Sequence, residues 1–212
     1  MGHPAFVLVA VSIAYTVLIV LLRSMSRFNE RTLDDVPAVL QAVSGQLLEE
    51  VLDAETEVDL RLSQNDETYR RELRSRLDVL REHTGRMAHN GLIVLQWGGT
   101  ERKDLNPPGF KANDDIESQE KVVALDLEAT KFRRLSLVYV ARTWLLCLWR
   151  FDKLRFLPVP SVAALRRIGG VDFIQAYQRL VEAAAGLALV YGEEEAQELR
   201  SRMWEMDSAL EG

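Results

Sequence analysis

The residues of this sequence best suited to bind a metal are three histidines, and their spacing argues against that role. His83 and His89 are six residues apart, so on one helix their side chains would point about 120° away from each other. Neither belongs to an HExxH or ExxH pattern, and His3 lies apart from them near the N-terminus. We interpret His83 and His89 as surface histidines or as histidines with satisfied ring nitrogens, and we expect no metal site.

The sequence also lacks a clear signature of nucleophilic catalysis or of phosphate binding. The single cysteine, Cys147, stands in an apolar run with no histidine near it in sequence to activate the thiol. We interpret it as a small buried hydrophobic residue. The sequence contains no GxxxxGK[ST] or GxGxxG loop, no GxSxG nucleophile elbow, no CxxCH haem motif and no EF-hand loop. We therefore predict no catalytic residue and no cofactor.

The charges are distributed unevenly along the chain. Residues 129–180 carry a net charge of +8, whereas residues 32–128 carry −10 and residues 181–212 carry −6. Six residues of the basic block are the candidate surface for a protein partner or for anionic lipid: Lys131, Arg133, Arg134, Arg150, Lys153 and Arg155. Such segregation favours contacts within the chain or with an anionic partner. Nucleic acid is disfavoured, because the chain is acidic overall and the aromatic residues of this block lie in apolar runs.

An uncharged apolar segment at residues 4–22 predicts a single transmembrane anchor. Its 19 residues would span about 28 Å as a helix, close to the hydrocarbon thickness of a bilayer. The residues that define this anchor and its charged end are Pro4, Phe6, Tyr15, Leu22, Arg23 and Arg27. Basic residues collect on the cytoplasmic side of a span, so we expect the N-terminus outside and the remaining chain in the cytoplasm. A cleaved signal peptide is the main alternative, although it would need positive charge before the apolar run.

Two domains follow from this division, with the anchor and its juxtamembrane segment at residues 1–31 and a helical domain at residues 32–212. Hydrophobic periodicity in the second part predicts an all-α fold of about five or six helices. We expect the first helix to run from Thr32–Asp35 to about Leu52. Acidic residues crowd its end, at 49–59, and are interpreted as a solvated face.

A second helix is expected after a turn at residues 63–66, with a break or a kink at Asn90-Gly91. A short apolar run follows, and then residues 98–115, which contain two glycines and a Pro-Pro-Gly sequence. We interpret residues 98–115 as a long loop, which is either a flexible connection or a functional loop.

The next helix is expected to begin at Asp114 or Asp115, either of which can cap it, and no glycine or proline follows before Pro158. Its second half, residues 135–149, is apolar on most of its circumference. We interpret that half as the central core helix. The alternative is a segment at the membrane interface, since basic residues precede and follow it and it contains Trp144 and Trp149. Further helices are expected at residues 162–168, after Asp172 and after Gly192.

An anchor followed by a helical domain without a chemical signature favours a non-enzymatic, membrane-tethered interaction protein: an accessory, assembly or scaffold subunit. One alternative is a membrane-associated enzyme or binding domain for a lipidic or hydrophobic ligand. Another is a signalling module whose anchor dimerises. The expected partners are the membrane, other protein subunits or a second copy, and anionic lipid.

Overall fold

The computed structural model describes residues 31–63, 65–105, 116–147, 161–168 and 170–205, and the chain from Arg31 onward forms one compact unit. The described residues are mostly helical, which confirms the all-α prediction. Their α-helices are α2 (Val36–Val39), α3 (Gly45–Val51), α4 (Ala54–Ser63), α5 (Asp66–Leu105), α6 (Ile116–Cys147), α7 (Phe173–Ala188) and α8 (Glu193–Met203). Of these helices, none combines the length and the apolar character needed to cross a bilayer. The expected anchor at residues 4–22 lies outside the described residues.

Two short strand pairs and two 3₁₀ turns complete the described elements. Strand β1 (Val43–Ser44) pairs in parallel with β4 (Trp204–Glu205), and β2 (Arg167–Ile168) pairs antiparallel with β3 (Val171–Asp172). The 3₁₀ turns are Leu33–Asp35 and Ala163–Leu165. The parallel pair joins the segment before α3 to the end of α8, which is far away in sequence.

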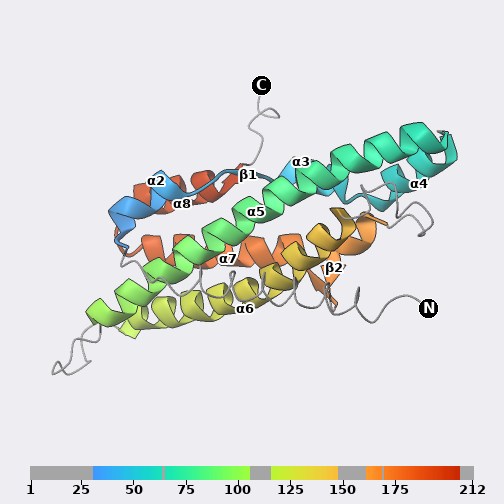
Figure 1. Cartoon of the computed structure of the whole chain (residues 1–212). Helices are drawn as coiled ribbons and strands as arrows, with labels where there is room; N and C mark the ends of the chain where they lie inside the picture. The colour runs from blue at the N-terminus through green and yellow to red at the C-terminus, as the bar shows by residue number, and fades with distance from the viewer. Residues whose placement is uncertain (1–30, 64, 106–115, 148–160, 169, 206–212) are drawn as a thin grey trace, which may run out of the picture. The chain divides into compact units, whose positions relative to one another are not determined.

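The core of the domain lies between α5, α6 and α7. Figure 1 shows α5 and α6 as long neighbouring helices, and α6 and α8 both pack against α7. Helix α6 buries one regular stripe: Ser118, Val122, Leu125, Ala129, Phe132, Ser136, Tyr139 and Thr143. The alternating four- and three-residue steps of this stripe are those of a helix that packs along one face.

This stripe confirms a core position for only one face of the described part of residues 135–149, which were interpreted as a central core helix. Tyr139 and Thr143 are buried, whereas Val138 is 46% exposed and Arg142 is exposed. The described part of this segment therefore covers the core from outside and keeps a second face open. The side chains of Trp144 and Trp149, which suggested a membrane interface, lie outside the description.

Helix α5 is continuous through Asn90-Gly91, so of the expected break or kink, the break is wrong. A Cβ atom on Gly91 would lie 2.9 Å from Cδ1 of Phe132, which shows that this glycine lets α6 approach closely. The helix also includes residues 98–105, which were expected to begin a loop. Cβ of a residue at Gly98 would lie 3.3 Å from Leu125, so this glycine too serves packing. Residues 106–115 lie outside the described residues.

The expected helix from residue 32 to residue 52 is interrupted. Leu40 adopts an extended conformation (φ −67°, ψ 147°), and the chain becomes helical again only after Ser44. Side chains of α5 bind the backbone of this interruption. Asn90 accepts a hydrogen bond from the Gln41 amide (2.9 Å) and donates one to the Gln41 carbonyl (2.7 Å), while Arg86 donates to the Ala42 carbonyl (2.9 Å). These contacts replace the helical hydrogen bonds that the sequence pattern predicted.

Several local signals are confirmed by the structure. The turn at residues 63–66 separates α4 from α5, and the Asp172 carboxylate caps α7 by accepting hydrogen bonds from the amides of Ile174 and Gln175. Helix α8 begins directly after Gly192. The expected helix at 162–168 is only a 3₁₀ turn, because Arg167 and Ile168 pair with β3 instead.

Candidate interaction surface

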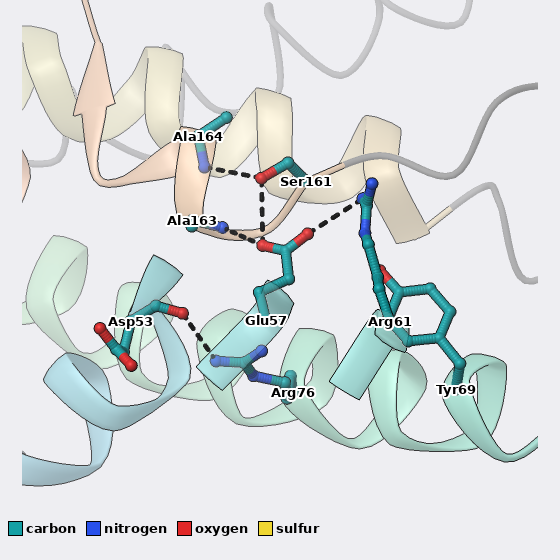
Figure 2. Close-up of polar contacts among 8 residues, drawn as sticks. All are labelled: Asp53, Glu57, Arg61, Tyr69, Arg76, Ser161, Ala163 and Ala164. Atoms are coloured by element: carbon teal, nitrogen blue, oxygen red, sulfur yellow. Dashed lines mark hydrogen bonds and ion pairs between the residues drawn. The ribbon is translucent and has the colours of Figure 1, made fainter. Parts of the chain in front are cut away.

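Glu57 is a buried carboxylate within the acidic run at residues 49–59, where the sequence predicted a solvated face. Figure 2 shows its two oxygens held from opposite sides. Oε2 accepts hydrogen bonds from the Ser161 hydroxyl (3.0 Å) and the Ala163 amide (2.9 Å), and Oε1 lies 3.1 Å from the Arg61 guanidinium. These contacts are all internal, so the carboxylate joins the turn at residues 161–165 to α4.

Arg76, drawn in the same view, binds the backbone around the end of α3 (Figure 2). Its guanidinium donates hydrogen bonds to the carbonyl oxygens of Glu50 (2.9 Å) and Asp53 (3.3 Å). Both carbonyls also accept a backbone amide, Glu50 from Asp53 (3.4 Å) and Asp53 from Glu57 (3.3 Å), so Arg76 adds a side-chain hydrogen bond where α3 ends and α4 begins. Hydrogen bonds from the hydroxyl and the amide of Thr56 lower the pKa of the Asp53 carboxyl. The whole cluster positions α3, α4 and α5 and has the character of a structural network.

A second buried carboxylate, Glu101, also uses both of its oxygens in internal hydrogen bonds. Its Oε1 accepts a hydrogen bond from the Trp97 indole (2.6 Å), and its Oε2 accepts one from the Tyr191 hydroxyl (2.5 Å). Burial, followed by the Glu101 hydrogen bond and charge, raises the pKa of Tyr191. This carboxylate therefore links the end of α5 to the segment after α7.

The histidines are separated, as their spacing predicted. His89 Nε2 lies 3.1 Å from the Val39 carbonyl oxygen and has a partner, as expected. His83 departs from the expectation, because it is buried and its Nδ1 has no hydrogen-bond partner in the described part of the chain. Throughout the described ranges, no three His, Cys, Asp or Glu side chains come close enough together to hold a metal ion.

A groove of about 580 Å³ lies between α6, α7 and β3. We call it the α6–α7 groove. Its wall is apolar around Phe132 and Val138 of α6 and Val171 of β3. Three basic side chains and one acidic side chain also line it: Lys131, Arg134, Arg179 and Glu128. The combination of apolar walls with convergent cations suits an anionic, amphipathic binding partner.

The cations of the groove differ in how far they are neutralised. Lys131 Nζ lies 2.6 Å from Oε1 of Glu128, one helical turn away. Arg134 and Arg179 are exposed, and neither forms an ion pair with a carboxylate of the described residues. A guanidinium can bind a carboxylate with two parallel hydrogen bonds, so these two arginines are the strongest recognition groups of the groove.

The apolar wall continues along the outer face of α6. Large apolar side chains are exposed there at Val123 (63%), Leu127 (52%) and Val138 (46%). On β3, Val171 is 40% exposed at the edge of the groove. Single exposed apolar residues are ordinary, but a row of them beside a cationic groove is typical of a binding surface.

The start of the described chain is fastened to α5. The Arg31 amide donates a hydrogen bond to the Thr100 hydroxyl (3.2 Å), and its Nε donates one to the Gln96 side-chain oxygen (2.9 Å). Gln96 and Thr100 are one helical turn apart on α5. Arg31 therefore belongs to the folded unit, and residues 23–30 separate it in sequence from the segment in which the anchor is expected.

The basic residues named from the sequence are divided by the structure. Lys131 and Arg134 line the groove, whereas Arg133 is half-buried and already engaged in an interaction of its own. Arg150, Lys153 and Arg155 lie outside the described residues. Sequence reasoning missed Arg179, which belongs to the same basic block but whose direction depends on how α7 packs against α6.

Comparisons with protein-family models, with curated proteins and with solved structures found no match for this chain.

Proposed function

We propose that this chain is a non-enzymatic, membrane-tethered interaction protein that presents its helical domain to another protein at the cytoplasmic face. The observation that carries the proposal is the α6–α7 groove, where Arg134 and Arg179 stand exposed beside apolar walls without a carboxylate partner in the described chain. The buried carboxylates Glu57 and Glu101 support a non-enzymatic role, because internal hydrogen bonds occupy them.

The tether is proposed from the sequence. Residues 4–22 are apolar and uncharged, and Arg23 and Arg27 follow them on the side that would face the cytoplasm. Only residues 23–30 separate this segment from Arg31, which is hydrogen-bonded into the domain.

Fractionation followed by affinity purification tests both parts of the proposal. The full tagged chain should sediment with membranes and resist carbonate extraction. In mild detergent it should then co-purify with another protein at a stoichiometric ratio. A chain that stays in the soluble fraction would contradict the tether, and a chain that purifies alone would contradict the interaction role.

Charge reversal connects the partner to the groove. The double variant Arg134→Glu/Arg179→Glu breaks no ion pair among the described residues, so it should fold normally and lose the partner. The control variant Arg71→Glu/Arg74→Glu makes an equal change in net charge at exposed positions of α5 and should retain the partner. If both variants co-purified equal amounts of the partner, the interface would have to lie outside the groove.

A second candidate function, the binding of a lipidic or hydrophobic ligand, is favoured by the apolar wall of the same groove. Phe132, Val138 and Val171 supply that wall. Mass spectrometry of lipids and small molecules retained by the purified chain tests this function. A defined ligand present at one per chain would support it, and only bulk membrane lipid at the level of the charge-reversed variant would contradict it.

A further inference from the structure

The outer face of α6 carries an ordered pattern of charge and apolar surface. Leu127, Lys131, Arg134 and Val138 are all exposed and follow one another at steps of four, three and four residues. On a helix these four positions lie within about 60° of arc, so they form one stripe about 16 Å long. We call this stripe the α6 seam: two cations in the middle and one large apolar residue at each end. Its cationic side opens into the α6–α7 groove, where Arg179 adds a third positive charge.

A second copy of the chain fits this seam poorly. A parallel pair of seams would place each cation beside its own equivalent, and an antiparallel pair would place Lys131 against Arg134. Both arrangements oppose like charges at close range, which is unfavourable by several-fold in affinity even at a surface. Glu128 of the second copy does not remove this repulsion, because it is already paired with Lys131 of its own chain.

A phospholipid also fits poorly, because its charge and its apolar part lie at opposite ends of the molecule. The α6 seam has apolar residues on both sides of its cations. A headgroup bound between Lys131 and Arg134 would leave Leu127 on one side and Val138 on the other, and acyl chains could cover only one of them. The pattern instead suits a ligand that is apolar, acidic and apolar along its length.

We propose that the α6 seam and the adjoining groove bind an amphipathic helix of a partner protein that carries acidic residues between two large apolar residues. The proposal rests on the proposed function and names the partner's chemistry. A helix alongside α6 repeats the same four-three-four spacing, so carboxylates three residues apart would face Lys131 and Arg134. Its apolar residues would cover Leu127 and Val138, and Arg179 would hold the acidic side from α7.

A synthetic helical peptide of about 20 residues provides the probe, long enough to be helical when bound. It carries Leu-x3-Glu-x2-Glu-x3-Leu within alanine and glutamine, and a scrambled peptide of equal composition is its control. Fluorescence anisotropy measures binding to the full-length chain in mild detergent. We expect the patterned peptide to bind at least tenfold more tightly than the scrambled one. We also expect the Arg134→Glu/Arg179→Glu variant to lose at least tenfold, and Arg71→Glu/Arg74→Glu to bind like the unmodified chain.

A charge swap distinguishes a specific contact from a damaged fold. A peptide with lysines in place of both glutamates should bind the Arg134→Glu/Arg179→Glu variant more tightly than it binds the unmodified chain. Equal binding of the patterned and scrambled peptides, or a failure of the charge swap, would overturn the proposal. Binding of phosphatidylserine vesicles with the same dependence on Arg134 and Arg179, in the absence of peptide binding, would overturn it in favour of lipid.

Co-purification of a stoichiometric protein from membranes tests the proposed function, whereas peptide binding tests the α6 seam. The proposed function and the α6 seam can therefore fail separately. A co-purifying partner that survives charge reversal at Arg134 and Arg179 would keep the function and reject the α6 seam. Peptide binding without any co-purifying protein would keep the chemistry of the seam and reject the function.

Discussion

Replacing Asn90 by alanine should destabilise the domain more than any change at an ordinary helix position. Asn90 is fully buried, and its side chain makes three hydrogen bonds. It accepts one from the Gln41 amide (2.9 Å) and donates to the Gln41 carbonyl (2.7 Å) and the Tyr177 hydroxyl (2.6 Å). Alanine removes all three and leaves partners from two other segments unsatisfied.

The expected loss is about 2–4 kcal/mol of the free energy of unfolding. Each unsatisfied buried group costs about 1–3 kcal/mol, but two of the three belong to Gln41, where the contacts are only partly buried and water can replace them. The Tyr177 hydroxyl is buried and keeps only its bond to the Met203 carbonyl (3.3 Å). Tyr177→Phe removes a smaller share of the network, so we expect a loss of about 1 kcal/mol from it.

Urea unfolding of the full chain in mild detergent, followed by far-ultraviolet circular dichroism, measures these losses. Hydrogen exchange adds a local readout, since the Gln41 amide should exchange faster in Asn90→Ala. The double variant with Tyr177→Phe should lose less than the sum of the single losses, because the two residues share a bond. A loss below about 1 kcal/mol for Asn90→Ala, or strictly additive losses, would refute the reasoning.

Three further changes test other parts of the fold. Gly91→Ala places a Cβ 2.9 Å from Phe132 and should lower the free energy of unfolding in urea by about 1–3 kcal/mol. Gly85→Ala meets open space and should raise it by about 0.5–1 kcal/mol. A change of the same sign in both variants would contradict the packing of Gly91 against Phe132. Tyr139→Phe removes a buried hydroxyl that has no partner in the described chain, so the melting temperature should hold or rise, and a clear fall would reveal a missed contact. Burial, reinforced by a nearby arginine charge, lowers the pKa of His83, so the unfolded state binds its proton first on acidification. The free energy of unfolding should therefore fall as the pH drops below about 6.5, and His83→Phe should reduce this fall. The same pH dependence in His83→Phe and in the unmodified chain would contradict the role given to His83.

Local sequence signals predicted the parts of the fold that depend on neighbouring residues. The turn before Asp66, the cap at Asp172 and the break at Gly192 all use contacts within a few positions. The long helix α6 was expected because no glycine or proline interrupts it. Its burial was misjudged, since an apolar composition cannot tell which face meets the core and which face stays open.

The errors arose where distant side chains decided the backbone. Leu40 to Ser44 have the spacing of a helix, but Asn90 and Arg86, more than forty residues away, bind the backbone in an extended form. Gly91 resembles a helix end in sequence, yet the ring of Phe132 occupies the space that a side chain would fill.

The candidate surface was predicted in part. The charge block identified Lys131 and Arg134, because basic residues on one helix can be counted from sequence alone. Arg179 and Val171 reach the same groove only through the packing of α7 and β3 against α6. Glu57 shows the opposite case, since its acidic neighbours suggested solvent while its own side chain is buried.

The most direct test of the interaction role is the native mass of the full-length chain, purified in mild detergent from the membranes of its own cells. We predict a mass that exceeds one chain by a stoichiometric protein partner, and the loss of that partner from the Arg134→Glu/Arg179→Glu variant but not from Arg71→Glu/Arg74→Glu. A single chain with detergent and bulk lipid alone would contradict the role proposed for this protein.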